Sequence, residues 1–190
     1  MKVLRKIILC TALIACPVFA AELEGVKLDD RVNAGKQELQ LNGMALRTRL
    51  FFKVYVAGLY LPQKTQDARS ALEMAGQKRI TLVMLREVGR VAFSEALTEG
   101  FGEANGDLGL SLFKSRVDAL QEILQGMGDA KTGMRIVFDF VPGTGTVVTV
   151  DGSVRGKPIP GDEFATALLN IWLGRGSVAD NVKRGLLGTP

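Results

Sequence analysis

The segment from Leu46 to Leu61, with the sequence LRTRLFFKVYVAGLYL, constrains the fold more than any other part of the chain. It is rich in β-branched and aromatic residues, as strands are, yet basic and phenolic side chains stand within it. If the chain reverses near Phe51, Arg47 and Tyr55 become cross-strand neighbours, because residue 51 lies midway between them. A guanidinium and a phenol would then converge on one anion. The alternative is that Arg47 and Arg49 only solvate an exposed strand end.

Strand patterns lie early and late in the chain, with helical patterns between them. Strands are expected at 37–41, 44–50, 51–61, 79–86, 134–141, 146–150 and 153–155, with a turn at Asn42-Gly43. Helices are expected at 67–75, 91–104 and 110–127, with a break around Asn105-Gly106, and again after Pro160, where Asp162 caps a helix that Gly174 ends. This order predicts an α+β fold.

Three other features have simple structural interpretations. Trp172 stands on an apolar helix face and is expected in the core. Asp139 is expected to face solvent from its strand. The turn from Pro142 to Gly145 is not a phosphate loop, because no Gly-Lys-Ser/Thr follows and the next element is a strand.

The first twenty residues predict the compartment. Lys2, Arg5 and Lys6 precede an apolar run, and small residues surround Ala20, which is typical of a secretory signal peptide. The run is too short for a membrane span, so residues 21–190 are expected to form one exported domain, periplasmic or secreted, with no integral membrane segment. A lipoprotein cleavage box ending at Cys16 is the alternative.

The composition excludes several classes of chemistry. Both cysteines lie in the predicted signal peptide and the chain has no histidine, which excludes disulfides, thiol catalysis, Ser-His-Asp triads and imidazole-ligated metals from the mature protein. The acidic residues lack metal-ligand spacing, and we predict no metal and no cofactor. Removing the signal leaves 21 basic and 20 acidic residues, or 21 − 20 = +1, which does not indicate nucleic-acid binding.

Several motifs, in order and spacing, resemble the chalcone isomerase superfamily, particularly its bacterial exported chalcone isomerase-like branch. They are LNGMALR (41–47), FKVYVAGLYL (52–61), MLR (84–86), FSEALTEGF (93–101), VPGTGT (141–146), IPG (159–161) and IWLG (171–174). The resemblance implies a chalcone isomerase-like fold: an antiparallel β-sheet with helices packed on one face, an open-faced β-sandwich, with a ligand cleft between sheet and helices.

Two functions occur on that fold, and the resemblance bears on both. The plant enzymes close a chalcone to a flavanone with an arginine, a threonine, a tyrosine and an asparagine. Arg47 matches the arginine, but Tyr55 stands at the threonine position. The remaining polar positions fall on Phe93, Gly100 and Ala165, the last beside Thr166, which leaves its register open. Related proteins bind fatty acids, and they grip the carboxylate with an arginine and a tyrosine like Arg47 and Tyr55.

The leading expectation is therefore a non-catalytic exported protein that binds a fatty acid or a similar small apolar carboxylate. Arg47 and Tyr55 would hold the head group, and the tail would lie among Val54, Leu82, Met84, Phe93, Leu97 and Phe101. One alternative is an isomerase (intramolecular lyase) acting on a chalcone-like or other enone substrate, with Arg47 as oxyanion stabiliser and Tyr55 as proton donor. A second is a structural interaction protein of the envelope. The sequence does not fix the oligomeric state.

Overall fold

The computed structural model describes residues 20–174 and 180–189, and the predicted signal peptide lies outside them except for Ala20. The elements, in chain order, are β1 (Ala20–Leu23), β2 (Val26–Asp29), β3 (Arg31–Ala34), β4 (Gln37–Arg49), β5 (Phe52–Leu61), α1 (Ala68–Glu73), β6 (Lys78–Met84), α2 (Arg90–Leu112), α3 (Lys114–Gly126), β7 (Arg135–Val141), β8 (Gly145–Val150), β9 (Ser153–Ile159), α4 (Asp162–Leu173) and α5 (Asp180–Leu186). Within the described ranges, no helix is both long enough and apolar enough to cross a membrane.

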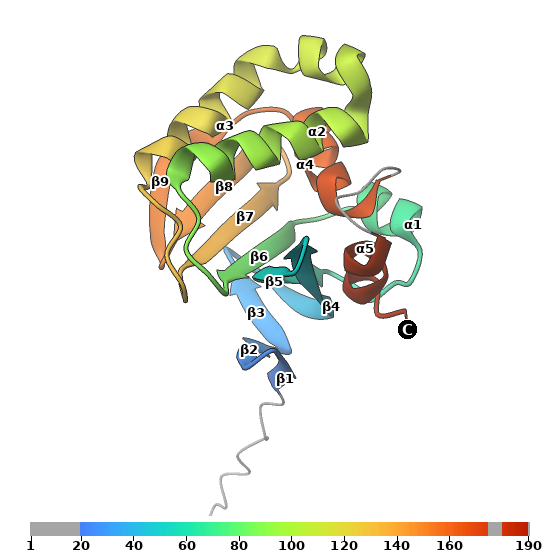
Figure 1. Ribbon diagram of the computed structural model, residues 1–190. Helices are drawn as coiled ribbons and strands as arrows, with labels where there is room; N and C mark the ends of the chain where they lie inside the picture. The colour runs from blue at the N-terminus through green and yellow to red at the C-terminus, as the bar shows by residue number, and fades with distance from the viewer. Residues whose placement is uncertain (1–19, 175–179, 190) are drawn as a thin grey trace, which may run out of the picture.

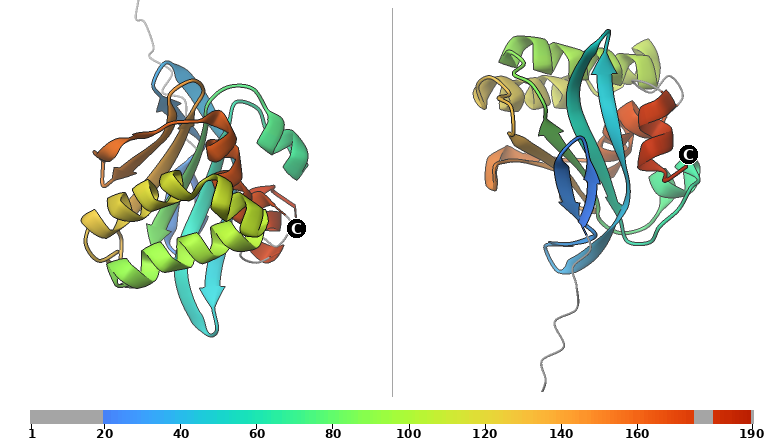
Figure 2. Two further views of the ribbon diagram at one scale, coloured as in Figure 1. Left: turned by 90° about the horizontal axis from the view of Figure 1, so that it is seen from above. Right: turned by 60° about the horizontal axis from the view of Figure 1, so that its bottom comes forward.

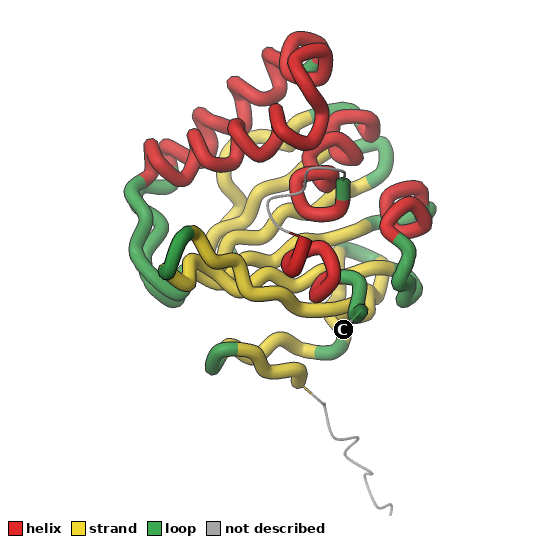
Figure 3. The backbone as a smooth tube through the Cα atoms, turned by 45° about the vertical axis from the view of Figure 1, so that its right-hand side comes forward, coloured by secondary structure: helices red, strands yellow, loops and turns green. Residues whose placement is uncertain are grey.

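A seven-stranded antiparallel sheet organises the fold, and its strands β3 to β9 lie side by side in chain order (Figure 1). Helices α2, α3 and α4 lie on one face of the sheet, and the β1–β2 hairpin lies on the other (Figure 3). The predicted α+β class, with an antiparallel sheet and helices on one face, is confirmed. The early and late strands of the sequence thus form one sheet.

Alternation along β5 explains how the sheet serves two cores. Tyr55, Ala57 and Leu59 belong to the core under the helices, whereas Val56 and Tyr60 belong to the core under the β1–β2 hairpin. Because both faces are covered, the strand is apolar almost throughout. Its position between β4 and β6 leaves only its first residues near solvent.

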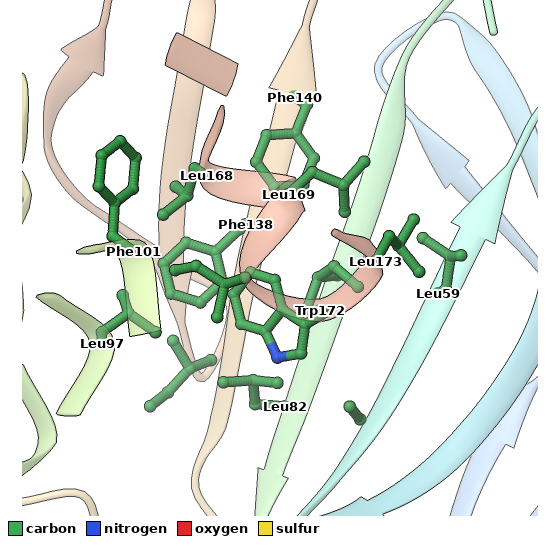
Figure 4. Close-up of a cluster of buried hydrophobic side chains, with 14 of the residues drawn as sticks. Leu59, Leu82, Leu97, Phe101, Phe138, Phe140, Leu168, Leu169, Trp172 and Leu173 are labelled. Carbon is green, nitrogen blue, oxygen red and sulfur yellow. The ribbon is translucent and has the colours of Figure 1, made fainter. Parts of the chain in front are cut away.

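The larger core surrounds α4, whose Trp172 is fully buried, as predicted. Figure 4 shows the indole among Leu59, Leu82 and Phe138, and the rings of Trp172 and Phe138 lie 5.8 Å apart between centroids. Burying a large apolar side chain of this kind contributes about 1.5–3 kcal/mol. The packing therefore fixes α4 against the middle of the sheet.

The predicted turn at Asn42-Gly43 is wrong. Strand β4 runs through both residues, and a β-bulge between Leu41 and Gly43 absorbs the irregularity. The hairpin turn that precedes β4 instead contains Gly35, whose φ of 59° suits a glycine.

Tertiary contacts explain why an Asn-Gly pair stands inside a strand. The Asn42 side chain donates to the carbonyl oxygens of Leu186 (2.7 Å) and Thr65 (3.0 Å), and its Oδ1 accepts from the Thr65 amide. A Cβ at Gly43 would stand 2.2 Å from the carbonyl oxygen of Gly185. The pair therefore docks α5, an element that the sequence pattern did not reveal, onto β4.

Asp139 is buried, so the prediction that it faces solvent is wrong. Its carboxylate accepts from Nε and Nη2 of Arg79 at 2.8 and 2.9 Å, and from the amide of Gln77 at 3.0 Å. Arg79 is its cross-strand partner, on β6. The strand pairing brings together two charges that lie 60 residues apart, which alternation along β7 alone does not reveal.

The helical region follows the predicted order with shifted boundaries. The break falls at Gly106, where φ is 70° and the helix kinks, but α2 continues beyond it to Leu112. Gly174 ends α4 as predicted, while Gly161 rather than Asp162 is its N-cap. Asp162 accepts from the Gly143 amide at 3.0 Å and so holds the turn before β8.

Candidate functional site

The β4–β5 hairpin brings Arg47 and Tyr55 together. The two residues are partners in the antiparallel register, so the predicted pairing is confirmed. The reversal occurs at Leu50 and Phe51, next to the midpoint that the sequence indicated.

A β-bulge changes which side chains face the helices. Arg47 pairs with Tyr55 but Thr48 pairs with Lys53, so Val54 is the extra residue of β5. In a regular strand Val54 and Tyr55 would point to opposite faces. Both instead line the same cavity, because the bulge turns Val54 toward it.

That cavity has a volume of about 540 Å³ and lies between the β4–β5 hairpin and helix α2. Its size falls within the range of about 300–1,000 Å³ that small-molecule sites occupy. Its walls are formed by Arg47, Arg49, Leu50, Phe52, Val54, Tyr55, Arg86, Glu87, Val88, Ala92, Phe93, Ala96, Leu97, Glu99, Gly100, Glu103 and Ile171.

Helix α2 supplies one wall through residues at helical spacing. Phe93, Ala96, Leu97 and Gly100 recur three or four positions apart and so share one face. Gly100 leaves little spare room, because a Cβ there would stand 3.2 Å from Cγ2 of Ile171. The wall is apolar at each of these four positions.

Tyr55 is the buried polar group of the site. Its hydroxyl oxygen accepts a hydrogen bond from Nε1 of Trp172 at 3.2 Å. Burial raises the pKa of Tyr55, although the Trp172 hydrogen bond and the nearby Arg47 charge oppose that rise. The phenol therefore stays protonated at neutral pH and keeps its own O–H to donate to a ligand.

Arg47 is the least exposed charged residue of the cavity lining. It is half-buried, whereas Arg49, Arg86 and the three glutamates of the lining are exposed at the rim. Among the described residues, no carboxylate forms an ion pair with Arg47. A cation held in an apolar wall without a protein anion is suited to a carboxylate ligand.

The structure separates the predicted tail residues into two groups. Val54, Phe93 and Leu97 line the cavity together with Arg47 and Tyr55. Leu82, Met84 and Phe101 are instead fully buried core residues beneath its wall. Sequence reasoning missed the lining residues Leu50, Phe52, Ala92, Ala96 and Ile171. The spacing of Ala92 and Ala96 on the face of Phe93 could have revealed those two.

Comparison with known families decides the classification. A sequence profile described as chalcone isomerase-like matches residues 20–188. The chain belongs to the chalcone isomerase-like family. The match includes every strand and helix of the described residues, from β1 to α5.

Solved structures give the same fold. A crystal structure of a fatty-acid binding protein from Arabidopsis thaliana superposes with a TM-score of 0.69 at 14% sequence identity. The superposition covers 89% of this chain and 96% of the plant protein. A comparison with curated protein sequences found no match.

Of the five positions that the resemblance matches to the plant enzymes, four lie at this cavity. Arg47, Tyr55, Phe93 and Gly100 all line it. Ala165 does not line it, and Thr166 is exposed and donates to the Asp162 carbonyl. On α2, Phe93 therefore stands at the position of the enzymes' tyrosine, and Gly100 stands at the position of their asparagine. Neither residue offers a polar side chain to the cavity.

Proposed function

We propose that this chalcone isomerase-like protein binds a fatty acid, or a similar apolar carboxylate, in the cavity between the β4–β5 hairpin and α2, without catalysing a reaction. The observation that carries the proposal is the pairing of Arg47 with Tyr55 in a largely apolar wall. The pair offers a fixed positive charge and a neutral hydroxyl donor. Both groups would donate hydrogen bonds to the same carboxylate.

The head group would be held by charge-assisted hydrogen bonds. A bond of this kind contributes about 1.5–3 kcal/mol, more than a neutral one. Trp172 already occupies one acceptor site on the Tyr55 oxygen, which favours the phenol as a donor to the ligand. Arg47 would supply the remaining N–H donors.

The tail would be held by burial of methylene groups against Val54, Phe93, Ala96 and Leu97. Each buried methylene contributes roughly 0.8 kcal/mol, so about ten would give about 8 kcal/mol before association entropy and desolvation are subtracted. Adding about 3 kcal/mol from the head group and subtracting at least about 4 kcal/mol for association leaves about 7 kcal/mol at most, which corresponds to a dissociation constant of about 10 μM or weaker. The fatty-acid binding protein that shares the fold supports this ligand class.

An isomerase acting on a chalcone-like or other enone is the second candidate, because Arg47 and Tyr55 would suit an oxyanion and a proton donor. Loss of one preorganised oxyanion donor lowers a rate about 100-fold to 1,000-fold. Because Phe93 and Gly100 stand at two of the enzymes' polar positions, two such donors are missing from the cavity lining. Turnover of a chalcone-like substrate that Tyr55→Phe abolishes would favour the enzyme.

The mature protein is proposed to act outside the cytoplasm, after removal of residues 1–20. The basic, apolar and small-residue pattern of that segment supports export. N-terminal sequencing of the mature protein distinguishes a start at Ala21 from a lipid-modified Cys16. A start at Met1 would contradict export.

Ligand extraction tests the binding proposal. Mature protein purified from its native envelope is extracted with organic solvent, and the extract is analysed by mass spectrometry. A bound acid is expected from the wild type and from Arg49→Ala, but not from Ala96→Phe, whose larger side chain would project into the cavity and obstruct it. Recovery of no acid from the wild type, together with unchanged acid binding in Arg47→Ala, would overturn the proposal.

A further inference from the structure

The tip of the β4–β5 hairpin exposes three consecutive large apolar residues. Leu50 is 84% exposed, Phe51 97% and Phe52 56%. Exposed single apolar residues are common, but a run of three at a loop tip is a local patch. The patch lies where the chain turns back between two long strands.

Leu50 also adopts a backbone conformation that leucine disfavours. Its φ is 55°, in the left-handed region, where glycine or asparagine would turn the chain with less strain. A hairpin of this length commonly carries Asn-Gly or Gly at such positions. The turn geometry therefore does not explain why leucine stands here, whereas a binding role of its exposed side chain would.

The tip projects from the body of the molecule. Figure 2 shows the β4–β5 hairpin extending past helices α2 and α3 in both views. Leu50 and Phe52 also line the cavity that contains Arg47 and Tyr55. The exposed patch is therefore convex and forms part of the cavity rim.

Two arginines lie beside the patch. Arg49 adjoins it in sequence, and the Arg86 guanidinium lies 4.3 Å from the centroid of the Phe52 ring. No carboxylate of the described residues forms an ion pair with either arginine. Lys53 is paired with Glu24 at 2.6 Å, and exposed Glu87 stands next to Arg86.

We propose that this tip, Leu50 to Phe52 with Arg49 and Arg86, docks the protein on the surface of an anionic lipid bilayer. Leu50 and Phe51 would enter the boundary between headgroups and acyl chains, and the two arginines would contact lipid phosphates. An apolar tip with two adjacent arginines that form no ion pair with a described carboxylate matches such a surface in charge and polarity. A protein partner fits less well, because stable interfaces bury on the order of 1,000 Å² or more and a narrow convex tip offers far less.

Docking in this way would hold the cavity rim against the bilayer. An apolar carboxylate would then pass between membrane and cavity without crossing water. This consequence rests on the proposed function, whereas docking itself does not require a ligand.

Vesicle flotation with delipidated mature protein tests the docking alone. The probes are phosphatidylcholine vesicles with and without phosphatidylglycerol. We expect the wild type to bind the anionic vesicles and Leu50→Asn/Phe51→Ser to bind them at least about tenfold more weakly. Asn suits the left-handed position, so this variant should keep the wild-type circular dichroism spectrum. Arg49→Glu should weaken binding to anionic vesicles, and added salt should do the same.

The matched control removes two exposed leucines elsewhere. Leu108 and Leu112 of α2 are 82% and 71% exposed and lie outside the cavity lining. Leu108→Ser/Leu112→Ser should bind vesicles like the wild type.

The proposal is overturned if the wild type does not float, if the control loses binding as much as the tip variant, or if the tip variant floats unchanged. A tip variant that instead dissociates an oligomer, measured by light scattering, would show a protein contact and also overturn it. Phe51→Ser should leave acid binding in solution unchanged, which separates this test from that of the proposed function.

Discussion

The indole N–H of Trp172 donates to the hydroxyl oxygen of Tyr55 across 3.2 Å, and it thereby links the centre of the hydrophobic core to the polar end of the cavity. Trp172 lies on α4 and Tyr55 on β5, 117 residues apart in sequence. The bond fixes the phenol from behind, on its core side. The orientation of the proposed head-group donor is therefore set by core packing.

A double-mutant cycle measures this link. Tyr55→Phe leaves the indole N–H buried without an acceptor, at a cost of about 1–3 kcal/mol in the free energy of unfolding. Trp172→Phe removes buried surface as well as the bond, and we expect a loss of about 2 kcal/mol or more. The double variant should lose about 1 kcal/mol less than the sum of the two, as read from urea denaturation. Strictly additive losses would show that the contact contributes no coupling.

Breaking the buried ion pair of Asp139 and Arg79 should lower the stability of the protein far more than breaking an ion pair on the surface. Asp139→Ala leaves the mostly buried Arg79 charge without its partner, which should cost about 3 kcal/mol. The exposed pair of Arg69 and Glu73 provides the control, and Arg69→Ala should lower the stability far less than Asp139→Ala. Chemical denaturation gives both values. Equal losses would contradict the assignment of Asp139 to the interior.

The close approach of β4 and α5 predicts a steric effect at Gly43. A Cβ there would stand 2.2 Å from the Gly185 carbonyl oxygen, so Gly43→Ala should cost about 1–3 kcal/mol or displace α5. Gly126, at the end of α3, has nothing within 4 Å of an added Cβ. Gly126→Ala should therefore be neutral or slightly stabilising. A thermal unfolding midpoint unchanged by Gly43→Ala would refute the contact.

The two tyrosines predict how stability depends on alkaline pH. Burial and the Asp29 charge raise the pKa of Tyr60 from 10.0 to about 12, and burial also raises the pKa of Tyr55. The folded protein thus keeps phenol protons that the unfolded chain loses near pH 10, so stability is full below that pH and falls as pH rises toward 12. The chain has only these two tyrosines, so phenolate absorbance reports on them alone.

Tyr60→Phe serves as the control for the alkaline titration. It should flatten the decline in the free energy of unfolding and remove one phenolate from the absorbance curve. Titration of both phenols near pH 10 in the folded protein would contradict the burial that the structure shows.

The sequence predicted the features that depend on neighbours along the chain. The pairing of Arg47 with Tyr55 follows from the position of one reversal, and the kink at Gly106 follows from a local break. The apolar helix face placed Trp172 in the core. Each of these depends on periodicity or turn geometry, which the sequence encodes locally.

The features that the sequence did not predict depend on contacts between distant segments. Asn42-Gly43 has the composition of a turn, yet α5 makes it a docking point. Asp139 alternates like a solvent-facing residue, yet Arg79 pairs with it across the sheet. The bulge at Val54 reorients one side chain into the cavity, whereas Leu82, Met84 and Phe101, which were predicted to contact the tail, lie in the core behind the cavity wall. Local periodicity does not distinguish a cavity wall from the core behind it.

The central claim is that Arg47 binds a carboxylate, and isothermal titration with head-group variants of one ligand tests it most directly. A fatty acid and the fatty alcohol of the same length are titrated into delipidated wild type, Arg47→Ala and Arg49→Ala. Arg47→Ala should weaken binding of the acid about 10-fold to 150-fold and leave the alcohol unchanged, because only the acid loses a charge-assisted bond. Arg49→Ala should alter neither affinity. Equal affinity of the acid for wild type and Arg47→Ala, or an equal loss for acid and alcohol, would contradict the account.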